Sequence, residues 1–135
     1  MLKEWIYQGL VERVVDADTF DILVDLGFGI SLNTRFRLTG ATRDFDAPET
    51  WRPKYESERR HGESATAHVK ELIEGKVVLI DSVKRGKYRY VAVVRFENND
   101  GIVTDLAEHL FESGYQKLDK EEYIRLDEEY HNEQS

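Results

Sequence analysis

The sequence contains no cysteine, so the chain has neither disulfides nor thiolate metal ligands. No apolar run approaches the roughly 18 residues that a membrane-spanning helix needs. Residues 1–10 also lack the long apolar segment of a secretory signal peptide. These absences lead us to expect a cytoplasmic protein with no membrane partner. No low-complexity linker divides the 135 residues, which predicts a single domain over residues 1–135.

Positive charge is scarce, because 19 lysines and arginines face 27 aspartates and glutamates, for a formal net charge of −8. Such a balance is unusual for a protein that handles nucleic acid. Residues 119–135, however, carry seven acids against two bases, or −5, which leaves −3 for residues 1–118. Segments 51–62 and 83–89 each carry four lysines or arginines. Basic patches of this kind can steer a polyanion toward an acidic protein.

Alternating apolar residues predict that the first half of the chain consists of strands. The clearest strand is residues 19–27, and the Gly-Phe-Gly turn that closes it predicts a hairpin with residues 30–38. The face that we expect to point inward from residues 19–27 carries Phe20, Ile22, Val24 and Leu26. Valine and aromatic residues predict further strands at residues 5–15, 76–83 and 88–96.

Three helices are expected at residues 62–75, 104–114 and 119–135. The second and third begin with an aspartate followed three residues later by a glutamate, which is capping-box spacing. Five short strands, with one helix between the third and the fourth, are the element order of a small OB-type barrel. We therefore predict an α+β fold, with a core over about residues 5–118 and an acidic C-terminal helix over residues 119–132.

Several carboxylates stand at positions that suit either structure or chemistry. By strand parity Asp18 shares the inward face of residues 19–27, where an unpaired carboxylate is costly and calls for a partner or a cation. The structural alternative is a turn residue that accepts backbone N–H bonds. Asp46 and Glu49 likewise fit a helix start, with Asp46 as the N-cap and Glu49 reaching back to it. Asp44 is expected in a loop.

Three arginines fall within predicted strands. Arg35 and Arg37 lie two residues apart and therefore share a face, and Arg89 falls beside the apolar residues of strand 88–96, on the face of Val91. Such an arginine needs a partner, either a phosphate or a structural carboxylate. The four histidines show no zinc-ligand spacing, and no nucleophile-elbow or nucleotide-binding motif is present.

Six segments in order resemble the staphylococcal nuclease (thermonuclease) family: VVDADTFDILV, FRL, DAPET, HGESATAHVKELIEGK, GKYRYVAVV and VTDLAEHLFESGYQKL. The resemblance covers about residues 11–118. It implies an OB-type barrel with three helices and a Ca²⁺-dependent nuclease that hydrolyses phosphodiester bonds of DNA or RNA and leaves 3′-phosphate ends. It also implies a nucleic-acid substrate for a protein that we expect to be a monomer.

The resemblance assigns roles to individual residues. Asp18 and Asp46 match the family's carboxylate ligands of calcium, and Ala47 takes the place that offers a backbone carbonyl. Glu49 matches the general base. Arg37 and Arg89 match the two phosphate-binding arginines, and Lys87 and Tyr88 stand where a neighbouring phosphate or nucleotide is contacted. The basic segment 51–62 falls at the family's mobile loop beside the cleft. Hard oxygen ligands of this kind suit Ca²⁺.

Two departures from the family pattern bear on these roles. ATRDF, residues 41–45, stands where one residue is expected, and four extra extended residues would move Asp46 by about 13 Å. The insertion must therefore bulge out if Asp46 is to meet Asp18. Otherwise Asp44 could take the ligand place, Arg43 could enter the phosphate site, and Arg35 could replace Arg37. KYR also lacks a glycine of the family's KYGR, which could shift Arg89.

Two other classes of function fit the same sequence. One is a catalytically inactive OB-type module that binds nucleic acid or protein, a reading supported by the acidic net charge and the altered loop. The other is an interaction domain that docks through its acidic last helix. Retention of both acids, the glutamate and both arginines favours the nuclease.

Overall fold

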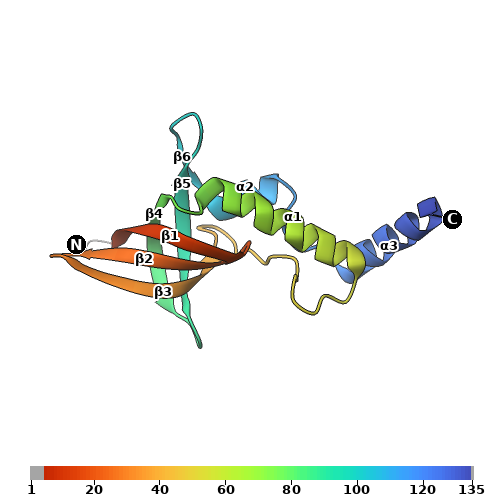
Figure 1. The fold of residues 1–135 in the computed structure, drawn as a ribbon, viewed down its shortest axis with the longest axis horizontal. Helices are drawn as coiled ribbons and strands as arrows, with labels where there is room; N and C mark the ends of the chain where they lie inside the picture. Colours follow the sequence, from red (N-terminus) through yellow and green to blue (C-terminus); the bar gives the residue numbers. More distant parts are fainter. Residues whose placement is uncertain (1–4, 135) are drawn as a thin grey trace.

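Five strands close into a small barrel in the computed structural model, which describes residues 5–134. They are β1 (Ile6–Asp16), β2 (Thr19–Gly27), β3 (Ile30–Thr39), β4 (Val77–Arg85) and β5 (Tyr90–Glu97). Neighbours pair antiparallel in the order β3-β2-β1-β4-β5, and a parallel pairing of β3 with β5 closes the ring (Figure 1). The predicted α+β fold with an OB-type barrel is confirmed.

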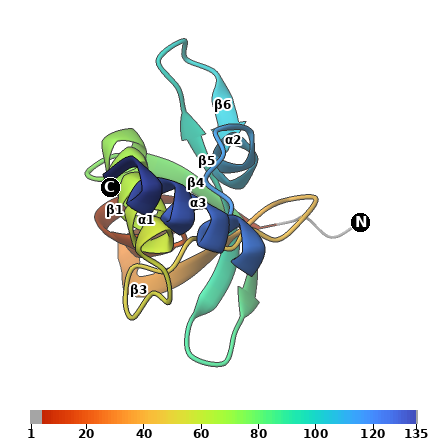
Figure 2. The same ribbon diagram turned by 90° about the vertical axis from the view of Figure 1, so that its right-hand side faces the viewer.

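Three helices and one short strand complete the fold. Helix α1 (Glu56–Ile73) connects β3 to β4, while α2 (Leu106–Glu112) and α3 (Lys120–Gln134) follow β6 (Val103–Asp105), which pairs with the edge of β5. The β4–β5 and β5–β6 hairpins project to opposite sides of the barrel (Figure 2). No helix within residues 5–134 is long and apolar enough to cross a membrane.

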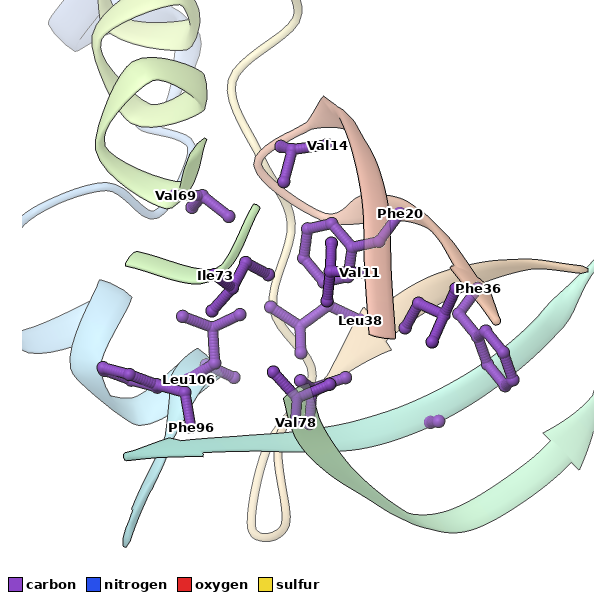
Figure 3. Packing of buried hydrophobic residues seen from close by; sticks show 14 of the residues in the cluster. Val11, Val14, Phe20, Phe36, Leu38, Val69, Ile73, Val78, Phe96 and Leu106 are labelled. Carbon is purple, nitrogen blue, oxygen red and sulfur yellow. The ribbon is translucent and has the colours of Figure 1, made fainter. Parts of the chain in front are cut away.

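Buried side chains of the barrel and of α1 form one core. Strands β1 to β3 direct Val11, Phe20, Ile22 and Leu38 inward, and Val69 and Ile73 of α1 pack over them (Figure 3). The alternation predicted for residues 19–27 is confirmed at Phe20, Ile22 and Val24. Leu26 lies on the same face, but it is 42% exposed because it lines the open end of the barrel.

Three predicted boundaries are wrong. Helix α1 begins at Glu56, six residues before Gly62, so half of the basic segment 51–62 is helical rather than loop. Strand β5 begins at Tyr90, which leaves Arg89 in the preceding turn. Residues 103–105 form β6, so helix α2 starts at Leu106 rather than at residue 104. The predicted cap is confirmed, since the Asp105 side chain accepts from Glu108 N–H.

The early start of α1 depends on contacts from α3. Its N-cap residue, Tyr55, makes no side-chain cap bond. Asp127 of α3 instead accepts the Ser57 N–H at 2.8 Å, and the Ser57 hydroxyl donates to the Tyr123 carbonyl at 2.9 Å. A carboxylate on another helix thus satisfies one of the free N–H groups at the start of α1. This capping also fixes α3 against the end of α1 that is far from the barrel (Figure 1).

Candidate functional site

Asp18 lies in the two-residue turn between β1 and β2, which is closed by the pairing of Asp16 with Thr19. Its Oδ1 accepts from the Thr19 hydroxyl at 3.0 Å and its Oδ2 accepts from Ala47 N–H at 3.3 Å. Burial raises the pKa of Asp18, and these hydrogen bonds oppose the shift only in part. Asp18 is therefore in a turn, as the structural alternative proposed, but its carboxylate faces a segment nearly thirty residues away.

The insertion at residues 41–45 bulges out of the barrel and returns to it. Gly40 N–H donates to the Arg43 carbonyl at 3.1 Å, which turns the chain, and Ala41 N–H donates to Asp105 at 3.2 Å. Phe45 then re-enters the core, where it is fully buried and packs edge-on against Phe111. The extra residues therefore pack against the start of α2 and Phe111, and the chain returns to the barrel at Phe45.

Arg43 is held on this bulge. Its guanidinium lies 3.7 Å from the centre of the Phe111 ring and 3.4 Å from a carboxylate oxygen of Glu108. The cation–π contact and the ion pair both direct it toward α2. The alternative that Arg43 enters the phosphate site is not what the structure shows.

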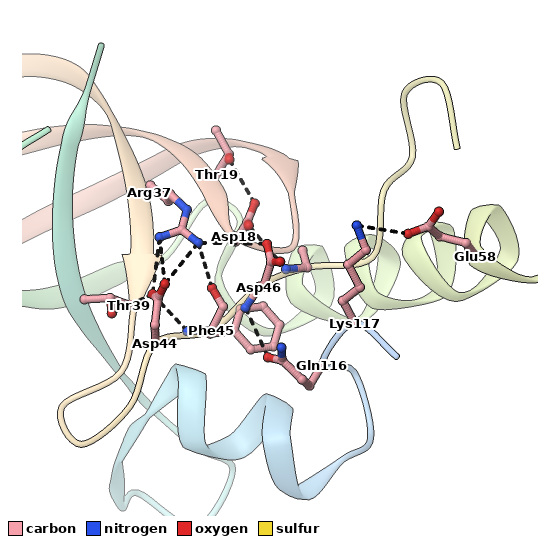
Figure 4. A network of polar contacts seen from close by, with 11 residues as sticks. Asp18, Thr19, Arg37, Thr39, Asp44, Phe45, Asp46, Glu58, Gln116 and Lys117 are labelled. Carbon is pink, nitrogen blue, oxygen red and sulfur yellow. Dashed lines mark hydrogen bonds and ion pairs between the residues drawn. The ribbon is translucent and has the colours of Figure 1, made fainter. Parts of the chain in front are cut away.

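Asp46 and Ala47 are positioned by the segment that follows α2. Asp46 N–H donates to the Gln116 side chain at 3.1 Å, and its carbonyl accepts from Lys117 N–H at 2.9 Å. The Asp46 carboxylate lies 3.9 Å from Arg37, and Ala47 N–H reaches Asp18. Asp18, Asp46, Ala47 and Arg37 are thus brought together on the outside of the barrel (Figure 4).

Arg37 is engaged by the insertion itself. Its Nη1 and Nη2 donate to the Asp44 carboxylate at 3.2 to 3.4 Å, and Nη2 also donates to the Phe45 carbonyl at 3.1 Å. Although burial acts in the opposite direction, hydrogen bonds from Thr39 and Arg37 lower the pKa of Asp44. Asp44 therefore serves as the counter-ion of Arg37 (Figure 4).

Arg35 shares the outer face with Arg37, as predicted, but it has its own partner. Its Nε and Nη2 donate to the Asp21 carboxylate at 2.8 and 3.2 Å. These bonds lower the pKa of Asp21, although burial acts in the opposite direction. Arg35 is therefore part of a cross-strand ion pair between β2 and β3 rather than a substitute for Arg37.

Glu49 lies in an irregular segment, so the expected helix start at Asp46 is wrong. Its carboxylate accepts from Trp51 N–H at 2.9 Å. Among the described residues it makes no hydrogen bond or ion pair with Asp18, Asp46 or Arg37. It lines a cavity of about 300 Å³ whose basic side chains come from three segments: Arg52, Lys54, Lys117 and Lys120.

Helix α1 holds this irregular segment from behind through Gly62. A Cβ at Gly62 would lie 2.7 Å from the Thr50 side chain and 2.8 Å from the Pro48 carbonyl. The helix therefore approaches the backbone before and after Glu49 as closely as a residue without a side chain permits. Thr50 is also fixed on the barrel side, since its hydroxyl donates to Asp16 at 2.7 Å.

Arg89, Lys87 and Tyr88 lie in the exposed turn between β4 and β5. Arg37 pairs with Val91 of β5, and Arg89 lies two residues before Val91, just outside the strand. Within residues 5–134 its side chain makes no hydrogen bond or ion pair. The expectation that Arg89 belongs to the strand face of Val91 is wrong, because β5 begins one residue after it.

Sequence reasoning missed a histidine pair outside this site. His68 of α1 and His109 of α2 have their Nε2 atoms 2.9 Å apart and their rings stacked. Burial, and then the neighbouring His68, lower the pKa of His109. The two residues are 41 positions apart, so no short motif indicates the pair.

Oxygen donors define what the site is able to bind. The Asp18 and Asp46 carboxylates and the Ala47 carbonyl are hard donors, which suit Ca²⁺ better than a softer metal. Across the described part of the chain, residues 5–134, no three His, Cys, Asp or Glu side chains form a metal-binding group.

Comparison of the chain with protein-family models and with curated proteins gives no match.

Proposed function

We propose that the protein is a Ca²⁺-dependent nuclease that hydrolyses phosphodiester bonds of DNA or RNA. The observation that carries this proposal is the 3.3 Å hydrogen bond from Ala47 N–H to Asp18. It requires the 41–45 insertion to bulge out, so that Asp46 and Ala47 return to the turn that holds Asp18. The same return places the Asp46 carboxylate 3.9 Å from Arg37.

Asp18, Asp46 and the Ala47 carbonyl would hold the calcium ion. Asp18 has room for it, since each carboxylate oxygen accepts only one hydrogen bond and retains a free lone pair. Partial burial without a directly bonded cation makes the charged form of Asp18 unfavourable, and a bound divalent ion would relieve that cost. When bound, the ion supplies positive charge against the phosphate of the substrate.

Arg37 would hold a non-bridging phosphate oxygen. Its side chain is only 22% exposed, and its planar guanidinium already binds a carboxylate in a two-pronged manner, the geometry that also suits phosphate. The substrate phosphate would displace Asp44 from Arg37; the Asp44 side chain is 64% exposed and would retain the Thr39 hydroxyl and Phe45 N–H as hydrogen-bond donors. Phosphate binding is therefore an exchange of one oxyanion for another on the same arginine.

Glu49 would take the proton of the attacking water. The water oxygen would attack phosphorus as the P–O5′ bond breaks, and the leaving O5′ would take a proton from solvent water, which gives 3′-phosphate and 5′-hydroxyl ends; Glu49 would then return its proton to solvent. For this role the Glu49 carboxylate must give up its hydrogen bond from Trp51 N–H. The Arg89 side chain, in the β4–β5 turn, must move toward the phosphate bound at Arg37. Lys87 and Tyr88 in that turn would contact a flanking nucleotide.

A second candidate function is a binding module without catalysis. It is favoured by the pairing of Arg37 with Asp44 and by the hydrogen bond that holds the Glu49 carboxylate on Trp51 N–H. Such a module would bind single-stranded nucleic acid without turnover.

The two functions are separated by incubating plasmid and single-stranded DNA with the full chain in Ca²⁺ and then in EDTA. The nuclease predicts cleavage that EDTA abolishes and that Glu49→Gln and Arg89→Ala each reduce by about two orders of magnitude or more. Asp25→Asn, at the exposed β2–β3 turn, is the control and should cleave normally. Binding without cleavage in Ca²⁺ would support the module, and cleavage that survives EDTA would exclude both accounts.

A further inference from the structure

The end of the barrel opposite Asp18 holds an open recess. This cavity of about 550 Å³ is lined by inward-facing side chains of all five barrel strands. Leu26, in its wall, is eight residues from Asp18, roughly 26 Å along an extended strand. Helix α1 packs over Val11 and Val14 at the other end, and no residue of α1, α2 or α3 lines this recess. The recess is therefore distinct from the carboxylate site.

Apolar and aromatic side chains make up most of its wall. Trp5 and Tyr7 stack on each other with centroids 6.5 Å apart, and Phe36 and Tyr90 form a second pair at 5.8 Å. Leu32 is 41% exposed and Trp5 73% exposed at the opening. Apolar surface of this extent is costly in water and commonly marks a binding site.

The charge of the described lining residues has one sign. Among them Lys84 is the only charged side chain, although the chain as a whole carries a net charge of −8. Arg85 adds a second positive charge beside it, donating to the Tyr90 hydroxyl at 3.3 Å and lying 5.3 Å from that ring. An occupant therefore meets apolar walls and one lysine, with a second cation beside it, and no carboxylate among the described lining residues.

We propose that this recess binds an amphipathic anion, with an apolar chain or ring inside the barrel end and an acidic head group on Lys84. The volume lies within the roughly 300–1,000 Å³ of small-molecule sites. The apolar body accounts for the apolar wall, and the head group accounts for Lys84, which makes no ion pair within residues 5–134. A cationic or a purely polar ligand would satisfy neither.

Dodecanoate is a suitable probe, because Trp5 lies in the wall and reports its binding. Trp51 is the only other tryptophan, so the full chain carrying Trp51→Phe leaves Trp5 as the sole reporter. We expect a saturable change in Trp5 fluorescence with dodecanoate below its micellar concentration. Dodecyltrimethylammonium, which has the same chain and the opposite charge, should bind at least about tenfold more weakly.

Substitutions in the wall of the recess test whether dodecanoate binds there. Leu32→Glu places a negative charge in the wall and should abolish binding, whereas Leu10→Glu, at a leucine of similar exposure that does not line the recess, should leave it unchanged. Lys84→Gln should weaken dodecanoate binding by about tenfold and leave dodecanol binding unaltered.

The proposal is overturned if Trp5 shows no saturable response, if the cationic detergent binds equally well, or if Leu32→Glu has no effect. It is also overturned if sedimentation shows that a second copy of the chain covers Trp5.

Discussion

Asp44 and Arg37 form a two-pronged ion pair in which Nη1 lies 3.2 Å from Oδ1 and Nη2 lies 3.4 Å from Oδ2. The pair joins the last residue but one of the insertion to the strand arginine expected to bind phosphate. Asp44 therefore occupies, with carboxylate oxygens, the place where the proposed function puts phosphate oxygens. In the proposed nuclease, Asp44 competes with the substrate.

Asp44→Ala should raise kcat/KM for oligonucleotide cleavage by up to about fivefold, because a partly exposed ion pair contributes at most about 1 kcal/mol. Asp21→Ala is the matched control, since it frees Arg35 on the same strand face in the same way and should leave cleavage unchanged. A fall in kcat/KM for Asp44→Ala would mean instead that Asp44 is itself a ligand of the metal.

Gly62→Ala should destabilise the protein, although alanine ordinarily stabilises a helix relative to glycine. The added methyl would meet Thr50 and the Pro48 carbonyl at 2.7 and 2.8 Å, and overpacking of this kind costs about 1–3 kcal/mol. Urea denaturation measures the loss. Ser64→Ala, at an exposed position of α1, should change the free energy of unfolding by less than about 0.5 kcal/mol. If the two substitutions change the free energy of unfolding equally, α1 does not pack closely against the segment around Glu49.

Local sequence patterns predict the strands and the barrel, but they predict the candidate site only in part. Alternation in residues 19–27 fixes β2 and its register, because one face must be buried. The start of α1 depends instead on Asp127, 70 residues beyond Ser57. Similarly, the contact of Asp18 with Ala47 follows from the path of the insertion, which no spacing in the sequence determines. Arg89 was misplaced because strand patterns do not resolve a boundary to one residue.

Asp127→Ala should lower the free energy of unfolding by about 1 kcal/mol, the usual effect of losing a helix N-cap. The substitution leaves the Ser57 N–H of α1 without its 2.8 Å partner on α3. Glu128→Ala, at the exposed next position, is the control. If both variants unfold at the same urea concentration, the cross-helix cap does not stabilise the fold.

Asp18→Asn should stabilise the calcium-free protein increasingly as the pH rises above 3.8. Burial raises the pKa of Asp18 from its ordinary value of 3.8, so the protonated acid favours the folded state. That contribution is fully present below pH 3.8 and is lost as the pH rises through the folded pKa. Urea denaturation of both proteins in EDTA, at several pH values, measures the difference. A difference that is constant with pH, or that favours the wild type at neutral pH, would contradict the burial of a charged Asp18.

The most direct test of the account is cleavage of a 5′-labelled single-stranded oligonucleotide by the wild type, Asp18→Asn and Asp46→Asn in Ca²⁺, with the product ends identified by mass. The account predicts fragments with 3′-phosphate ends from the wild type, none in EDTA, and a rate at least about a hundredfold lower for each variant. Wild-type cleavage that either substitution leaves unchanged, or a wild type that binds the oligonucleotide in Ca²⁺ without cutting it, would contradict the proposal that these two carboxylates form the calcium site of a nuclease.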